Sequence, residues 1–196
     1  MAWISENYIE LVGAIAGLVY LYFSIKQNIL LWPLGIITSA IYVYVFFITK
    51  FYADMGLQVY YLGISIYGWY IWSRGKYLEK EQKELPVTQL RLKNWPILII
   101  ITSFLTVGIS FILIRYTDSE LPYWDAFTTA ASVVATWMLA RKVIDHWIFW
   151  IIIDAVSTGL YAYKELYPTV GLFVVYTIMA IIGYRTWRKD LIESDN

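Results

Sequence analysis

WPLGIITSAIYVYVFF (residues 32–47) decides the fold, because its sequence pattern recurs 115 positions later as WIFWIIIDAVSTGLYA (147–162). The residues that follow each stretch continue the same correspondence. The pairs in this single register are Trp32 with Trp147, Tyr52 with Tyr167, Gly56 with Gly171, Leu57 with Leu172, Tyr61 with Tyr176, Gly68 with Gly183 and Trp72 with Trp187. Shared Trp, Tyr and Gly positions without a gap are not expected by chance. The pattern indicates two copies of one module, over residues 8–74 and 123–189.

The amino-acid composition indicates whether this chain folds in water or in a membrane. Hydrophobic residues make up 60%, aromatic residues 19% and charged residues 15%, and the mean hydropathy is +0.57. Soluble domains have about 45–50% apolar and about 25% charged residues, so we predict a membrane protein. The formal net charge of zero does not suggest nucleic acid. The chain has no cysteine, and its single histidine, His146, has no second histidine to join it. We therefore expect no metal site, no cofactor and no catalytic residues.

Apolar runs of the length that crosses a bilayer occur seven times. They lie at 8–25, 29–48, 53–73, 95–115, 123–140, 147–163 and 168–187. The start of the chain lacks a basic segment and carries Glu6 and Glu10, so we expect the first run to be a retained helix and not a cleaved signal peptide. A module of three spans ends on the opposite face from where it began. A second copy can keep the same orientation only if one further span, here 95–115, returns the chain.

The expected fold is therefore an all-α integral membrane protein of seven transmembrane helices, arranged as 3+1+3 with parallel repeats. The expected parts are a first three-helix repeat (1–74), a basic linker with the connector helix (75–122), a second three-helix repeat (123–189) and a tail (190–196). Parallel repeats related by an axis along the membrane normal are a transporter design, with the substrate near the midplane. A receptor, a channel and an intramembrane enzyme are the alternatives.

Basic residues orient the helices, because cytoplasmic loops carry the excess of Lys and Arg. They cluster in the 74–93 loop, after the fifth span and after the last one, at Arg74, Lys76, Lys80, Lys83, Arg91, Lys93, Arg141, Lys142, Arg185, Arg188 and Lys189. The acids Glu6, Glu10, Asp118 and Glu120 fall on the other side. We expect the N-terminus outside and the C-terminus in the cytoplasm, with the 74–93 loop as a linker that sets this topology.

One acid lies deep in a span. Asp154 sits near the middle of 147–163, where an ionisable side chain is costly unless it faces a partner or a wet cavity. Helical spacing puts it on one face with aromatic and hydroxyl side chains, and the third span has a similar stripe. The expected substrate-binding residues are Gln58, Tyr61, Ser65, Trp69, Trp72, Trp147, Trp150, Asp154, Ser157, Tyr161 and Tyr176.

Aromatic faces around one carboxylate suit a flat cation, since a cation over an aromatic ring gains about 0.5–2 kcal/mol. The alternatives stay open: Asp154 as a packing residue or a proton relay, and Trp72 and Trp187 as an interfacial belt instead of a gate. The chain has no phosphate loop for ATP-driven transport and no lysine in 168–187 for a retinal Schiff base. Facilitated diffusion is the simplest mechanism left.

Several motifs resemble the Pnu family of bacterial vitamin transporters over nearly the whole chain. They are WPLGI (32–36), YAD-x-x-LQ (52–58), YGW-x-x-W (67–72), W-x-x-W-x-x-x-D (147–154), LY (160–161) and GY-x-x-W (183–187). The resemblance implies a SWEET-like fold in the bacterial inner membrane, a substrate between the repeats, and passive uptake made one-way by a cytoplasmic kinase that does not bind stably. Homotrimers also occur in this family. Its binding positions map onto Gln58, Trp69, Trp72, Trp147, Trp150, Asp154 and Tyr161.

The family resemblance leaves several substrates open. Its best-known branch takes up nicotinamide riboside, and sister branches carry thiamine or riboflavin. The first two are flat cations and fit the aromatic and carboxylate pattern, whereas riboflavin is neutral and larger. We predict nicotinamide riboside, with thiamine as the alternative. From other classes, a SWEET-type sugar uniporter would gain little from Asp154, and a membrane receptor would bind without flux.

Overall fold

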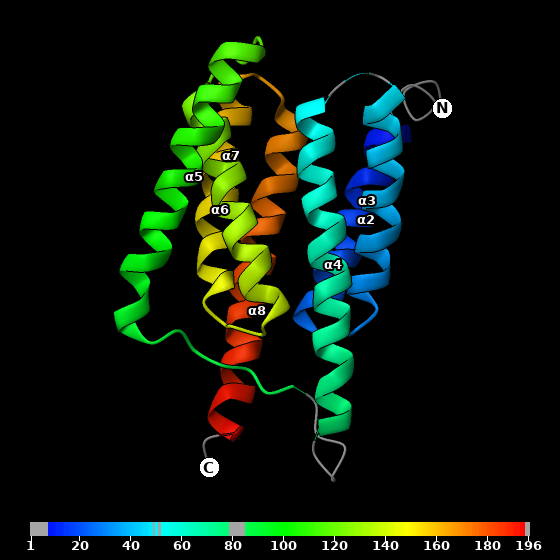
Figure 1. Cartoon of the computed structure of the whole chain (residues 1–196), viewed down its shortest axis with the longest axis vertical. Helices are drawn as coiled ribbons and strands as arrows, with labels where there is room; N and C mark the ends of the chain where they lie inside the picture. Colours follow the sequence, from blue (N-terminus) through cyan, green and yellow to red (C-terminus); the bar gives the residue numbers. More distant parts are fainter. Residues whose placement is uncertain (1–7, 49, 51, 79–84, 195–196) are drawn as a thin grey trace. The chain divides into compact units, whose positions relative to one another are not determined.

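The computed structural model describes residues 8–48, 50, 52–78 and 85–194, and this part of the chain is helical (Figure 1). Its elements are α2 (Tyr8–Ile25), α3 (Leu31–Ile48), α4 (Tyr52–Leu78), the 3-10 helix η1 (Leu92–Asn94), α5 (Trp95–Tyr116), α6 (Pro122–Ala140), α7 (His146–Tyr163) and α8 (Tyr167–Ser194). The chain divides into two compact units, Met1–Leu85 and Pro86–Asn196. The predicted connector helix, α5, thus falls in the second unit, where it packs on α6.

The helices of the two units begin in matching places. α3 begins at Leu31 and α7 at His146, while α4 begins at Tyr52 and α8 at Tyr167, so both pairs are 115 positions apart. The turns between them match as well. Among the described residues, the non-glycine residues with positive φ are Gln27 (51°), Lys50 (63°), Lys142 (51°) and Glu165 (58°), which form two pairs at the same offset. A left-handed residue is uncommon outside glycine, so each helix triplet shares unusual turn conformations with the other.

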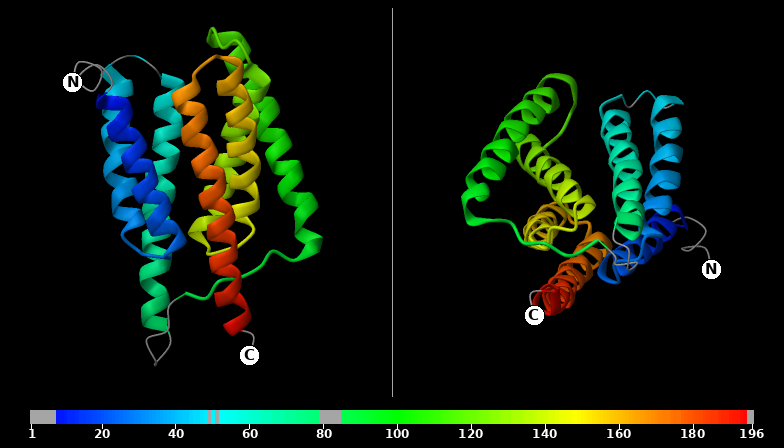
Figure 2. Two further views of the ribbon diagram at one scale, coloured as in Figure 1. Left: turned by 180° about the vertical axis from the view of Figure 1, so that it is seen from behind. Right: turned by 60° about the horizontal axis from the view of Figure 1, so that its bottom comes forward.

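In the first unit, one tryptophan joins α3 to α4, which lie side by side in Figures 1 and 2. The Trp32 side chain is fully buried, and its ring meets Trp72 edge to face with centroids 5.4 Å apart and planes at 86°. A Cβ added to Gly68 would lie 2.5 Å from the Trp32 ring. Glycine at this position is therefore what allows the ring to lie against the backbone of α4.

The second unit repeats this arrangement between α7 and α8. Trp147 is fully buried and meets Trp187 edge to face at 5.9 Å and 86°, and a Cβ on Gly183 would lie 2.5 Å from the Trp147 ring. His146 adds a ring to this cluster, 4.5 Å from Trp147 and 4.7 Å from Trp187. Edge-to-face pairs of this kind stabilise by about 0.5–1.5 kcal/mol beyond burial. Trp72 and Trp187 are 4% and 0% exposed, so both are packing residues and neither forms a lipid-facing belt.

Small residues let α6 pack closely in the second unit. Ten of its 19 residues are buried, and Ala131 and Ala135 form a core with Ile153 of α7. A second core joins α5 to α6 through Leu98, Val134 and Met138. Small side chains allow helix backbones to approach each other in a membrane, where van der Waals packing drives association.

An extended segment before α5 is bound to the turn between α6 and α7. The Thr88 N–H donates to the Lys142 carbonyl at 2.9 Å, and the Ile144 N–H donates to the Thr88 carbonyl at 2.8 Å. The Leu90 N–H donates to the Asp145 carboxylate at 2.6 Å. We call residues 87–91 the strap. It ties the predicted linker to the loop that precedes His146.

Three stretches are long and apolar enough to cross a bilayer by length and composition, within the described residues: Leu31–Ile48, Leu92–Tyr116 and Tyr167–Ile192. A shorter apolar stretch, Gly13–Ile25, lies in α2. Seven spans were predicted. α6 and α7 carry Asp125, His146 and Asp154, which lower their apolar character, and α7 keeps His146 and Asp154 buried among other protein groups.

Candidate functional site

Asp154 is the central residue of the candidate site. It lies midway along α7 and is only 5% exposed, between the buried side chains of Ile153 and Ser157. The helix is intact around it, since its own carbonyl accepts a bond from the Thr158 hydroxyl at 2.7 Å. Within the described part of the chain, no cation pairs with its carboxylate. A carboxylate in this position is costly in a membrane unless a ligand or water meets it.

Aromatic side chains of α7 and α8 form a cluster that is linked to this carboxylate through Tyr176. Asp154 is close enough to Tyr176 of α8 to interact with it electrostatically. The Phe173 ring lies 5.5 Å from Tyr176 at 69°, and 5.0 Å from Tyr161 of α7 at 33°. The structure therefore brings together three of the predicted residues. Phe173 was not predicted, because at the repeat offset it corresponds to Gln58, a different residue type.

The predicted residues of α4 lie in the first unit. Trp69 is 45% exposed, whereas Ser65 is buried where α4 meets α3. A Cβ on Gly35 would lie 2.6 Å from the Ser65 hydroxyl oxygen and 3.7 Å from the Tyr20 ring. Tyr61 is partly exposed, and its ring lies 5.6 Å from that of Tyr60. Tyr20 was not predicted, because it lies on α2, for which the sequence offered no polar stripe. Gln58 is also half-buried on α4.

Some predicted residues are engaged in packing. Trp72 and Trp147 form the two edge-to-face pairs described above. Trp150 is partly buried against the cluster of Ala131, Ala135 and Ile153, so part of its ring lies against α6. The geometry favours a structural role for Trp72 and Trp147. It leaves the ring of Trp69 and the cluster around Asp154 as the better candidates for contact with a substrate.

The chemistry of the Asp154 cluster is that of a cation site with aromatic walls. Tyr161, Phe173 and Tyr176 offer ring faces and two phenol hydroxyls, and Ser157 adds a hydroxyl one helical turn after Asp154. The described residues contain no group of three His, Cys, Asp or Glu side chains that could hold a metal ion. This arrangement can hold a flat cationic ring by charge and stacking.

Comparison with known proteins identifies the family of this chain. The sequence model of the family described as "Nicotinamide mononucleotide transporter" matches residues 7–189. The chain belongs to this transporter family. Members of the nicotinamide mononucleotide transporter family are membrane transporters, not enzymes.

Relatives of this family member differ in their named substrates. The nicotinamide riboside transporter PnuC of Escherichia coli (strain K12) is 27% identical over 205 residues, which cover 92% of this chain and 85% of PnuC. The riboflavin/roseoflavin transporter RibM of Streptomyces davaonensis is 25% identical over 183 residues, which cover 91% of this chain and 83% of RibM. The chain is therefore similar in sequence to transporters named for two different vitamins.

A solved structure supports the fold of this family member. The crystal structure of the vitamin B3 transporter PnuC matches with a TM-score of 0.75 at 22% identity, and the match covers 98% of this chain and 85% of that chain. The all-helical fold predicted from the sequence is thus confirmed.

Proposed function

We propose that this protein carries nicotinamide riboside across the bacterial inner membrane by facilitated diffusion. The observation that carries the proposal is the Asp154 carboxylate, which is buried in α7 within electrostatic range of Tyr176 and has no described cation as its partner. The names of the PnuC relatives support the substrate. A cytoplasmic kinase would phosphorylate the imported nicotinamide riboside and so trap it inside the cell. This kinase need not bind the transporter stably.

Charge separates the candidate substrates. Nicotinamide riboside has a permanently cationic pyridinium ring, which gains from a carboxylate and from aromatic faces. The mononucleotide in the family's description carries a phosphate as well. A phosphate would be repelled by Asp154, and the described residues of α7 contain no Lys or Arg to bind it. We therefore favour the riboside over the mononucleotide.

Asp154 has the central role in the proposed site, as the counter-charge of the pyridinium ring. Tyr161, Phe173 and Tyr176 supply ring faces, and Ser157 supplies a hydroxyl for the ribose. Gln58, Tyr61, Ser65 and Trp69 stay predicted contributors from α4, and Trp150 stays one from α7. Trp72 and Trp147 would act indirectly, by holding their helices together.

We further propose the SWEET-like 3+1+3 architecture, with seven spans, parallel repeats, an outer N-terminus and a cytoplasmic C-terminus. The matched turns and the matched Trp and Gly contacts of the two helix triplets support a duplicated module. The basic residues after α6 and in the C-terminal part of α8 support the orientation. A homotrimer stays a prediction from the family resemblance.

Uptake into proteoliposomes tests the proposal. We expect radiolabelled nicotinamide riboside to equilibrate without accumulating, and an imposed pH gradient to leave the plateau unchanged. Asp154→Asn should weaken the binding of nicotinamide riboside by about 2 kcal/mol, which is roughly a thirtyfold rise in Kd. The neutral reduced riboside, which has almost the same shape, should bind both proteins alike, and Asp154→Glu is the charge-retaining control. Equal losses for the cationic and neutral ribosides would contradict the counter-charge role.

Thiamine is the second candidate, because it is also a flat cation and would use the same carboxylate. Its uptake should be measured in the same vesicles, together with riboflavin, since RibM is among the relatives. Uptake of thiamine but not of nicotinamide riboside would reassign the substrate and keep the site. Uptake of a neutral sugar would favour a uniporter that gains little from Asp154. Binding without flux would indicate a receptor.

A further inference from the structure

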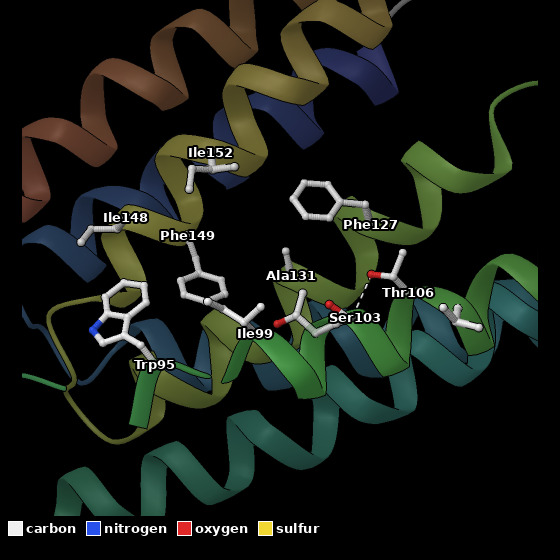
Figure 3. A pocket seen from close by; sticks show the side chains of 11 residues that line it. Trp95, Ile99, Ser103, Thr106, Phe127, Ala131, Ile148, Phe149 and Ile152 are labelled. Carbon is white, nitrogen blue, oxygen red and sulfur yellow. Dashed lines mark hydrogen bonds between the residues drawn. The ribbon is translucent and has the colours of Figure 1, made fainter. Parts of the chain in front are cut away.

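A groove of about 480 Å³ runs along α5, α6 and α7 within the second unit. Figure 3 shows Trp95, Ile99, Ser103 and Thr106 of α5 on one side of it, with Phe127 of α6 and Ile152 of α7 opposite. The groove is separate from the Asp154 cluster, because no residue of that cluster lines it. Its wall is mostly hydrocarbon and aromatic.

Two of the three hydroxyl groups that line the groove donate to carbonyl groups of their own helix. The Thr102 hydroxyl donates to the Leu98 carbonyl at 2.8 Å, and the Thr106 hydroxyl donates to the Thr102 carbonyl at 2.8 Å. A polar solute would therefore compete with intrahelical hydrogen bonds at these two positions. An alkyl chain needs no donor, so the lining favours an apolar occupant.

One end of the groove is positively charged. Trp95 marks this end, with its ring stacked on Phe149 at 6.2 Å and 27°. Just before it, Arg91 and Lys93 are exposed and flank Leu92, whose side chain is 86% exposed. The sequence from 86 to 117 contains no acid. The nearby Asp145 is 2% exposed and already accepts the Leu90 N–H, so an anion at this end would meet mainly positive charge.

We propose that this groove binds one acyl chain of an anionic phospholipid, with the phosphate at Arg91 and Lys93. From Trp95 to Thr106 is eleven residues of helix, about 16 Å at 1.5 Å per residue. The acyl region of one bilayer leaflet is about 15 Å deep, half of the hydrocarbon core. A chain in the groove thus spans one leaflet while its head group stays at the basic end. Leu92 would enter the same leaflet between the two cations.

Native mass spectrometry of the delipidated protein in detergent tests this site. The probes are palmitoyl-oleoyl phosphatidylglycerol, which is anionic, and palmitoyl-oleoyl phosphatidylcholine, which has the same chains and no net charge. Two cations at a membrane surface predict a preference of about thirtyfold for the anionic lipid at the first binding event. The double variant Arg91→Gln and Lys93→Gln should remove this preference. The matched control is Arg188→Gln with Lys189→Gln on α8, which removes the same charge away from the groove and should keep the preference.

A second pair of variants tests the acyl chain. Ser103→Phe fills the groove from α5 and should abolish the first binding event for both lipids, whereas Ile100→Phe adds a ring on α5 outside the groove lining and should not. If Ser103→Phe does not give a folded protein by circular dichroism, Ile99→Trp fills the same space. Equal affinity for both lipids, or a preference that survives the loss of Arg91 and Lys93, would overturn the proposal. A fall in oligomer mass with unchanged lipid binding would instead assign the groove to a second copy of the chain.

Discussion

At the residue scale, the two repeats share their packing residues and differ at a buried position that can carry charge. Trp32 and Trp147 are equivalent, and both are packed on a glycine. Ser39 and Asp154 are also equivalent and both are buried, but only Asp154 can carry a charge. The packing residues thus keep their identity between the repeats, while the candidate ligand for a cation occurs in one repeat alone. A duplicated scaffold with one altered position is a simple route to a site for a charged substrate.

Gly183 tests the packing role at this scale. Gly183→Ala would place its new Cβ about 2.5 Å from the Trp147 ring, between two rigid elements. Overpacking of this kind costs about 1–3 kcal/mol, so we expect a lower Tm by circular dichroism in detergent. Gly159→Ala is the control on α7, where nothing lies within 4 Å of the added Cβ. It should be neutral or slightly stabilising, because alanine favours a helix by up to about 1 kcal/mol over glycine. Equal Tm values for both variants would refute the contact.

At the element scale, the strap connects α5 to the turn before α7. Its bonds from Thr88 to Lys142 and from Ile144 to Thr88 form a short parallel bridge. The Asp145 carboxylate adds the third attachment, at Leu90. Burial raises the pKa of Asp145 above its ordinary value, although the backbone N–H groups of Leu90 and Asp145 oppose that rise. The charged form of this carboxylate therefore costs stability, even though one of its oxygens accepts a bond.

Two substitutions of Asp145 distinguish the effect of its charge on stability from the effect of its hydrogen bond. Asp145→Asn keeps an oxygen for the Leu90 N–H and removes the buried charge, so at neutral pH we expect stability equal to or slightly above that of the wild type. Asp145→Ala leaves that N–H without its acceptor, which costs about 1–3 kcal/mol. Hydrogen exchange of the strap amides and the Tm should both show this order. Asparagine as damaging as alanine would mean that the charge itself holds the strap.

The pH dependence of this attachment has a definite sign. A carboxyl group whose pKa is raised in the folded state binds a proton more readily there than in the unfolded chain. Its contribution to stability is thus greatest at low pH and declines as the pH rises from the unfolded pKa through the folded pKa. The wild-type Tm should show this decline relative to Asp145→Asn in the same buffers.

At the scale of the whole molecule, the proposed orientation can be tested cleanly, because the chain contains no cysteine. Glu120→Cys lies in the exposed loop before α6, and Arg188→Cys lies in the exposed part of α8. A membrane-impermeant maleimide should label the first variant in intact cells and the second only after permeabilisation. The reverse result would invert the topology assigned from the Lys and Arg distribution.

Much of the helical layout was predictable from the sequence. The seven apolar runs correspond to α2 through α8, and the register of 115 residues also appears in the paired turns at Gln27 and Lys142. This succeeded because a long apolar run has few alternatives to a helix in lipid, where each backbone polar group needs a partner. Candidate site residues were less predictable. Helical spacing identifies a face, but not which neighbouring element covers it.

The sequence by itself determined four features. They are the membrane environment, the all-helical class, the repeat at an offset of 115 residues, and the presence of one acid deep in a span. Each follows from composition or periodicity, which act locally along the chain. Only the tertiary structure decided that Trp72 and Trp147 are enclosed against other rings, that Phe173 joins Tyr161 to Tyr176, and that the strap attaches to Asp145. These contacts join residues on different helices or loops, and packing across helices is set by side-chain shape, which spacing along one helix does not encode.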